Sequence, residues 1–142
     1  MTKVSFSNHA AVRVRRTERD RIRTFYRDVL GAIHTRAFED KDDFRLGDDY
    51  HIGFLYASGA GVEADQGVSY APAEALSDED FLKAIFLELK ADDVEEARRR
   101  IVAFGVRVLD VPDPHLYFQA PGGQVFRLVG STEDLSKYEG AN

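Results

Sequence analysis

The feature of this sequence that most constrains its fold is an internal repeat. Gly53 lies 22 positions after Gly31, and Arg127 lies 22 positions after Gly105. A chain of 142 residues has the usual size of one domain, so the two copies are expected to be modules of a single fold. The same alignment superimposes two apolar pairs, Phe44 with Phe118 and Ile52 with Phe126.

The first copy begins as a strand and continues as an amphipathic helix. The helix is predicted over 17–30, because apolar residues recur there at helical spacing and Gly31 follows where a left-handed cap is expected. Thr17 is the expected N-cap. Turns are predicted at 41–43 and 47–49. The predicted strands are His9–Val14, Ile33–Glu39, Phe44–Leu46 and Tyr50–Tyr56.

The second copy repeats this order. Asp93 and Glu96 form a start like a capping box for a helix over 93–104, and Gly105 ends it. A short helix is expected within 74–83. The predicted strands are Ile85–Ala91, Val106–Val111, Leu116–Gln119 and Gln124–Val129. Each copy is therefore a strand, a helix and three strands, which predicts the α+β fold class with two βαβββ modules in tandem.

We predict that residues 1–142 form a single domain. Module 1 is expected at about 8–57 and module 2 at about 84–130. The linker between them, at about 58–77, is rich in Gly, Ala, Ser and acids, and its length suits a lid over a site. The tail, 131–142, is polar and has room for one surface helical turn.

Composition excludes several function classes. The chain has 19 basic and 25 acidic residues, and its net charge of -6 opposes binding to nucleic acid or to anionic lipid. It has no cysteine, which excludes disulfides, thiolate metal sites and cysteine nucleophiles and fits a reducing compartment. Because no signal-peptide layout and no membrane-length apolar run is present, we expect a cytoplasmic protein.

Arginines are concentrated between positions 13 and 27. Acidic residues are interleaved with them, so the cluster is interpreted as a solvated helix face, with an anion site as the alternative. The cluster comprises Arg13, Arg15, Arg16, Arg19, Arg21, Arg23 and Arg27.

Two motifs resemble the vicinal oxygen chelate superfamily, which contains glyoxalases, bleomycin-resistance proteins and extradiol dioxygenases. The first is FYRDVLG at 25–31, after a strand that begins with His9, and the second is YFQAPGG at 117–123. The resemblance covers about residues 8–130. It implies curled mixed sheets that enclose a cavity, a frequent homodimer, and often a divalent metal held by four strand residues.

The metal positions that this resemblance implies are mostly substituted. His9 matches the first of them and is a residue type that the metal-dependent members use. The other three positions fall on Gly53, Phe86 and Arg127, and Arg127 adds a positive charge that repels a cation. The sequence therefore favours a protein that lacks the usual four-ligand metal site and has no metal cofactor.

Strand parity predicts which side chains face the cavity, because residues two apart share a face. The opposite positions are mostly apolar and are expected to pack on the helices. Arg127, in an otherwise apolar strand, needs a partner, either Glu88 or a bound anion. Ordinary surface or structural roles stay open for His9, His51 and Glu88. The candidate ligand-binding residues are His9, Arg13, His51, Phe86, Glu88 and Arg127, whereas His34 and His115 are interpreted as surface residues.

Two main functions are consistent with these residues. The favoured one is a metal-free module that binds a small anionic or oxygen-rich molecule, with Phe86 stacking on it and Arg127 supplying charge. The alternative is a metal-dependent lyase, isomerase or dioxygenase with one divalent ion held by His9, His51 and Glu88, a ligand set that suits non-haem iron among other metals. A dimeric scaffold with a relic cavity is a third possibility. A homodimer is the expected assembly, and whether the chain catalyses a reaction stays open.

Overall fold

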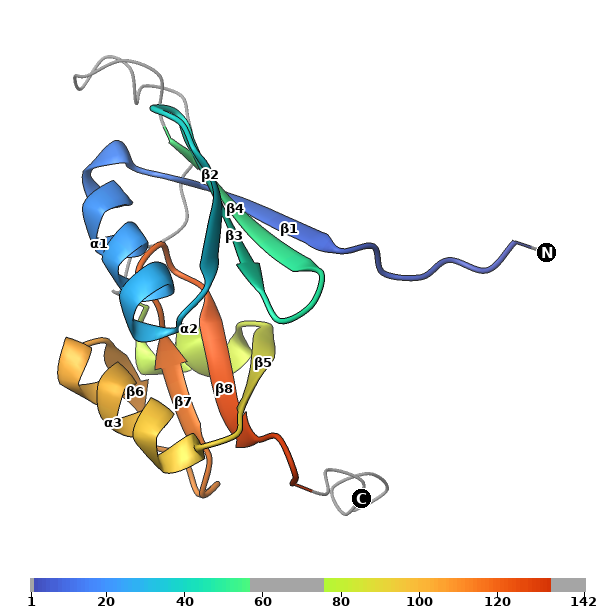
Figure 1. Cartoon of the computed structure of the whole chain (residues 1–142). Coiled ribbons are helices and arrows are strands. Elements are labelled where there is room, and N and C mark those ends of the chain that lie inside the picture. The colour runs from blue at the N-terminus through green and yellow to red at the C-terminus, as the bar shows by residue number, and fades with distance from the viewer. Residues whose placement is uncertain (1, 57–75, 134–142) are drawn as a thin grey trace.

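A computed structural model describes residues 2–56 and 76–133 and shows two similar modules (Figure 1). Module 1 comprises β1 (His9–Val14), the 3-10 turn η1 (Arg16–Glu18), α1 (Arg19–Arg23), the π-helical segment η2 (Thr24–Val29), β2 (Ile33–Ala37), β3 (Lys41–Leu46) and β4 (Tyr50–Tyr56). Module 2 comprises α2 (Asp78–Lys83), β5 (Phe86–Ala91), α3 (Val94–Phe104), β6 (Arg107–Leu109), β7 (Leu116–Gln119) and β8 (Val125–Gly130).

Each module contains one four-stranded mixed sheet. The strand order is β1-β4-β3-β2 in the first sheet and β5-β8-β7-β6 in the second. The first strand of each module runs parallel to the last, and the other neighbours are antiparallel. This identical topology confirms the predicted α+β fold with two βαβββ modules, although the two sheets are not closed onto each other.

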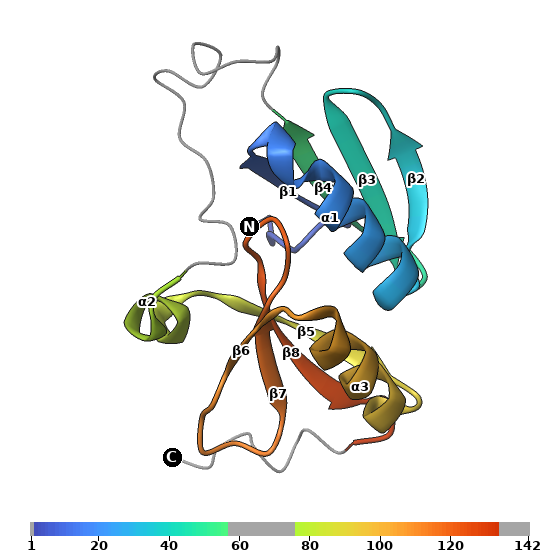
Figure 2. The same ribbon diagram turned by 90° about the vertical axis from the view of Figure 1, so that its left-hand side faces the viewer.

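The helices α1 and α3 cover the same side of both sheets (Figures 1 and 2). The apolar strand positions face them, as strand parity predicted, and one core cluster runs through both modules. The ring of Phe25, in η2, lies 5.2 Å from that of Phe104 and 5.9 Å from that of Phe118. Burial of these apolar side chains holds the two modules against each other.

The turn between β7 and β8 presses against module 1. Gly122 has a φ of +89°, and a Cβ at this position would lie 2.8 Å from the Phe54 ring. Its backbone N–H donates to Glu18 Oε1 at 3.2 Å. Only glycine fits this conformation and this close approach, which explains the PGG sequence of the turn.

The first helix is present but differs in detail from the prediction. It begins at Arg16 rather than after a Thr17 cap, and neither η1 nor α1 has a side-chain cap. The wider π turns of η2 follow, and the adjacent residues Phe25 and Tyr26 are both fully buried there. The tertiary core therefore determines the geometry of this helix more than its local capping signals do.

The predicted turn at 41–43 was wrong, because these residues begin β3. The chain turns just before them, where the Phe38 N–H donates to the Lys41 carbonyl at 2.8 Å. Asp42 and Asp43 are buried in the strand, with 0% and 5% exposure. Both carboxylates have partners from other elements, so burial overrides the usual preference of aspartate for turns.

The short helix expected within 74–83 is α2, and Ser77 caps it by accepting from the Asp80 N–H at 3.1 Å. It packs on the second sheet through Phe81, which forms a small cluster with Leu109 and Val125. The predicted linker is described only from residue 76 and the tail only to residue 133; the remainder of each lies outside the described residues. None of the helices in the described ranges has the length and apolar character needed to cross a bilayer.

Candidate functional site

The sheet side that faces away from α1 and α3, here called the open face, carries the sequence-predicted residues. On the first open face the strand register arranges side chains in three rows. Strand parity therefore placed His9, Arg13 and His51 on the expected side. The rows are Arg13, Leu55 and Lys41; Ala11, Gly53, Asp43 and Arg36; and His9, His51, Arg45 and Ile33.

The first open face is strongly basic. Its rows contain four permanent cations, and Asp43 is their one carboxylate. The Asp43 carboxylate lies 3.4 Å from His9 Nε2 and 3.7 Å from both Arg36 Nε and Lys41 Nζ. Sequence analysis missed Lys41 and Asp43 because it assigned them to a turn. No local pattern marked them as strand residues, because three successive polar residues, 41–43, do not alternate with apolar ones.

Asp43 fills the space that a side chain at position 53 would need. A Cβ on Gly53 would lie 2.5 Å from Asp43 Oδ1 and 3.3 Å from His9 Nε2. Position 53 is where the family resemblance implies a metal-binding carboxylate. The glycine therefore allows a carboxylate from β3 to lie beside His9, in contact with cations rather than in an open ligand position.

The donor atoms of the described residues do not fit the usual metal site. His9 is the only one of the four implied positions with a ligand atom, since Gly53 and Phe86 offer none and Arg127 is cationic. The substitute set is not assembled either, because the Glu88 carboxylate bonds Arg127 rather than lying with His9 and His51. Within residues 2–56 and 76–133, no three His, Asp or Glu side chains are grouped so that they could hold a metal ion.

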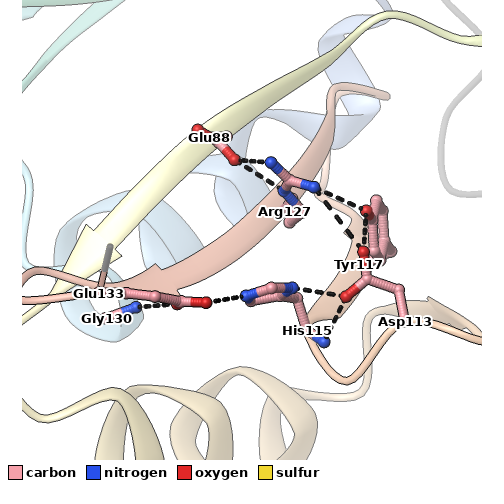
Figure 3. A network of polar contacts seen from close by, with 7 residues as sticks. All are labelled: Glu88, Asp113, His115, Tyr117, Arg127, Gly130 and Glu133. Atoms are coloured by element: carbon pink, nitrogen blue, oxygen red, sulfur yellow. Dashed lines mark hydrogen bonds and ion pairs between the residues drawn. The ribbon is translucent and has the colours of Figure 1, made fainter. Parts of the chain in front are cut away.

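The second open face brings together Phe86, Glu88 and Arg127, and Figure 3 shows the contact between Glu88 and Arg127. Arg127 Nε donates to Glu88 Oε2 at 2.7 Å, and its Nη2 donates to the same oxygen. Its Nη1 donates to the Tyr117 hydroxyl at 3.1 Å, and the Phe86 ring lies 4.9 Å from the guanidinium. Arg127 therefore has partners within the chain. Burial lowers its pKa, but the interactions with Glu88 and Tyr117 together outweigh burial and hold the pKa above its ordinary value.

The polar network extends from Arg127 to the end of β8 (Figure 3). The Tyr117 hydroxyl donates to Asp113 Oδ2 at 2.8 Å. Asp113 Oδ1 lies 2.5 Å from His115 Nδ1, and Glu133 Oε1 lies 2.5 Å from His115 Nε2. Because both ring nitrogens face carboxylates, His115 is best satisfied as the imidazolium, which donates to both.

Hydrogen bonds shift the pKa values of this network. Burial alone would lower the pKa of His115, but the bonds to Glu133 and Asp113 outweigh it and raise the pKa. Burial raises the pKa of Asp113, but its bonds from the His115 backbone and ring and from Tyr117 keep it below its ordinary value. The Tyr117 pKa is raised, chiefly by burial. The network therefore favours the ionised form of Asp113 and the imidazolium form of His115.

The interpretation of His34 and His115 as surface residues was wrong, because their side chains are only 14% and 8% exposed. His34 Nε2 lies 2.7 Å from Asp42 Oδ1, and Asp42 Oδ2 accepts from Arg23 Nε at 2.8 Å and from the Tyr56 hydroxyl at 2.6 Å. Burial raises the Asp42 pKa, but these bonds outweigh it and lower the pKa. This cluster lies on the helix side of the first sheet, where it stabilises the module.

The segment that leads into α2 covers part of the second open face. Arg107 Nε donates to the Leu76 carbonyl at 2.8 Å, and its Nη2 donates to Asp78. The Leu76 N–H donates to Gln119 Oε1 at 3.2 Å, and Gln119 is fully buried. Because Arg107 belongs to β6 and Gln119 to β7, these hydrogen bonds hold the segment on the second sheet.

Together, the duplicated fold and a histidine at the start of the first strand define the class of glyoxalase-like proteins. The sequence profile of the Glyoxalase/Bleomycin resistance protein/Dioxygenase superfamily matches residues 7–122, and the chain belongs to this superfamily. Among curated protein sequences, none matches the chain.

Solved structures with the same fold have low sequence identity to this chain. A fosfomycin resistance protein, FosX, from Listeria monocytogenes has a TM-score of 0.62 and 16% identity over 95% of each chain. An integron cassette protein from V. cholerae has a TM-score of 0.60 and 18% identity over 93% of this chain and 99% of that one. Lactoylglutathione lyase from Agrobacterium tumefaciens has a TM-score of 0.56 and 18% identity over 92% of this chain and 96% of that one.

Proposed function

We propose that this chain binds a small anionic or oxygen-rich molecule between its modules, without the usual four-ligand metal site. The observation that carries the proposal is the basic first open face, whose rows contain four cations and one carboxylate in a chain of net charge -6. A local charge so different from that of the whole chain would concentrate anions at this surface.

The arginines of this face suit an oxyanion. Guanidinium groups bind carboxylates and phosphates through paired N–H donors. Arg13 is exposed, and Arg45 Nε is buried without a hydrogen-bond partner among the described residues. His9 and His51, which pair in register, provide ring N–H groups in the same row as Arg45. These groups would contact the anionic end of the ligand directly.

The second open face would contribute apolar contact rather than charge. Arg127 bonds Glu88 and Tyr117, so its charge is compensated within the chain. The exposed Phe86 ring, at 40% exposure, offers a surface for the body of the ligand. Phe86, Glu88 and Arg127 thus remain ligand-contacting candidates, with Arg127 and Glu88 acting as a neutral pair.

One similar structure supports an anionic ligand. The FosX protein from Listeria monocytogenes is complexed with Mn(II) and a dihydroxypropylphosphonic acid. A phosphonic acid is a small, oxygen-rich anion of the class that the first open face fits. The proposal for this chain differs in its binding groups, because arginine, lysine and histidine take the place of the metal.

Calorimetry with benzylphosphonate, and with benzyl alcohol as the neutral probe, tests this function. The phosphonate is expected to bind more tightly, and Arg13→Ala or Arg45→Ala should each weaken it by about tenfold, the loss of one charge-assisted hydrogen bond. Arg99→Ala, on an exposed position of α3, is the matched control and should change nothing. Equal affinities for the two probes, or an equal effect of all three variants, would contradict the proposal.

The second candidate is a metal-dependent lyase, isomerase or dioxygenase. The 3.4 Å contact between His9 and Asp43 favours it, because both side chains are of metal-binding types. Metal analysis of protein purified without a tag or chelator separates the two functions. About one metal ion per chain that is lost in His9→Ala would support this enzyme and overturn the metal-free proposal.

We also propose a homodimer that acts in the cytoplasm. Val4, Phe6 and Ile85 are 96%, 99% and 83% exposed, and a second copy could cover such side chains. Light scattering coupled to size exclusion is expected to give twice the chain mass of 16.0 kDa. A mass of one chain at micromolar concentration would contradict the dimer.

A further inference from the structure

A cavity lies outside the basic face. It is a groove of about 240 Å³ between α2 and the second sheet. Ligand pockets for drug-sized molecules begin at roughly 300 Å³, so this groove suits a smaller molecule. Its lining is mainly apolar and includes Phe81, Ala84, Phe86, Leu109, Tyr117 and Val125.

The groove has one charged group among the described residues that line it, the Asp113 carboxylate. The Asp113 side chain is 29% exposed, so a molecule in the groove can reach it. Its Oδ2 accepts from the Tyr117 hydroxyl at 2.8 Å, whereas Arg127 Nη1 is 3.7 Å away, beyond hydrogen-bond distance. A carboxylate oxygen can accept two hydrogen bonds, so Oδ2 has room for another donor.

The charge around Asp113 favours a cation as that donor. Asp113 shares both of its nearest basic groups with another carboxylate, since Arg127 also bonds Glu88 and His115 also bonds Glu133 (Figure 3). On the other side of the groove the acidic start of α2, 78–80, is partly compensated, since Asp78 bonds Arg107 and Glu79 bonds Lys83. An additional positive charge would therefore be attracted mainly by Asp113 itself.

We propose that the groove between α2 and the second sheet binds a small protonated amine, with its ammonium group at Asp113 and its apolar body against Phe86, Leu109 and Val125. The ammonium donates to Asp113 Oδ2, and the apolar body displaces water from the groove. This groove lies on the second sheet and shares the Phe86 ring with the ligand position proposed above, but the binding of its ammonium group does not depend on the charges of the basic face.

Binding of hexylamine, hexanol and hexanoate, measured by NMR titration of the full chain, tests the site. The three probes have the same apolar body and differ in the charge of the end group. Hexylamine is expected to bind at least about tenfold more tightly than hexanol, and hexanoate more weakly than either. Equal affinities for amine and alcohol, or no binding of the amine, would overturn the proposal.

Two variants assign the effect to the groove. Asp113→Asn keeps the shape but removes the charge, so hexylamine should bind no better than hexanol. Asp110→Asn, at an exposed acid that does not line the groove, is the matched control. Retention of the amine preference in Asp113→Asn would refute the site.

A third variant leaves the polar network untouched. Ala84→Phe adds bulk at the edge of the groove and should abolish binding of both amine and alcohol, whereas unchanged binding would place the ligand elsewhere. Arg45→Ala should leave hexylamine binding unchanged, which distinguishes this site from the one on the basic face.

Discussion

The two open faces have the same strand register but differ in charge. The first is basic, whereas the charged side chains of the second are largely paired within the chain. In the first sheet, Gly53 and Asp43 occupy the positions that Arg127 and Tyr117 occupy in the second. Gly53, the small residue of the first pair, leaves room for the Asp43 carboxylate from the next strand, and the first open face is basic. The large residue of the second pair is bonded to its neighbours, and α2 covers part of that face. The duplicated backbone thus supports one face suited to a ligand and one that is largely self-satisfied.

The largest change in the free energy of unfolding is expected at Asp42, where the first sheet buries a charge that the second sheet lacks. Asp42 corresponds in the repeat to the apolar Leu116, and it accepts hydrogen bonds from Arg23, His34 and Tyr56. Asp42→Ala leaves these buried donors unpaired and should reduce the free energy of unfolding by about 3–5 kcal/mol. Urea unfolding measures this, with the exposed turn residue Asp48→Ala as a control that should have little effect.

The same aspartate gives this contribution a pH dependence. Its pKa is lower in the folded protein, so the stabilisation is present above the ordinary carboxyl pKa, about 3.9, and is lost as pH falls through the folded value. Asp42→Ala should therefore lose less stability on acidification than the unsubstituted chain. An equal acid sensitivity of both would contradict this assignment.

The second prediction compares one arginine from each open face. Arg127→Ala leaves Glu88 without its partner and should cost about 1–3 kcal/mol of unfolding free energy. Arg13→Ala, at an exposed position, should cost within about 0.5 kcal/mol while weakening anion binding. Urea unfolding and calorimetry on both variants separate the roles. The comparison fails if Arg13→Ala is the more destabilising of the two.

The third prediction concerns the glycine that distinguishes the faces. Gly53→Ala places a Cβ against the Asp43 carboxylate and should reduce the free energy of unfolding by about 1–3 kcal/mol through local overpacking. The NMR signals of the His9 ring should shift with the displaced carboxylate. Ala11→Ser, a small exposed residue in the same row, is the control. Unchanged His9 signals in Gly53→Ala would show that Asp43 does not fill this space.

The smallest expected effect is the titration of His115 in the second module. Its bonds to Glu133 and Asp113 raise its pKa above the ordinary 6.5, so its contribution to stability is full below that value and is lost as pH rises through the folded pKa. NMR titration measures this directly. Glu133→Gln should lower the pKa, and a His115 pKa below 6.5 in the unsubstituted chain would contradict the network.

The sequence was sufficient to predict the repeat and the side of each strand that faces the helices. Both depend on patterns within a few residues: the period of apolar side chains and the glycines that end the helices, Gly31 and Gly105, which have φ values of 73° and 93°. Phe44 and Phe118, aligned by the repeat, are both fully buried. The partner of Arg127 followed from the same reasoning, because Glu88 lies opposite it in register.

Contacts between distant segments could not be predicted in this way. The burial of Asp42 depends on Arg23 and Tyr56, which belong to other elements, whereas aspartate by itself favours a turn. His115 looked like a turn residue because its partner Glu133 lies 18 positions later. The position of α2 on the second sheet depends on Arg107 and Gln119. The sequence therefore predicted which side of the sheet carries the candidate site, but it did not predict the charge of that site.

The glycine-rich turn at 121–123 packs against Phe54 and Ile22 of the other module, and this contact affects the cooperativity of unfolding. Because the aromatic core of each module is completed by the other, neither module would be expected to fold as an independent fragment. Heat or denaturant should then unfold both halves in one transition. Two polypeptides divided between residues 57 and 75 would depend on mutual association for their structure, so that mixing them should restore a fold that neither half adopts alone.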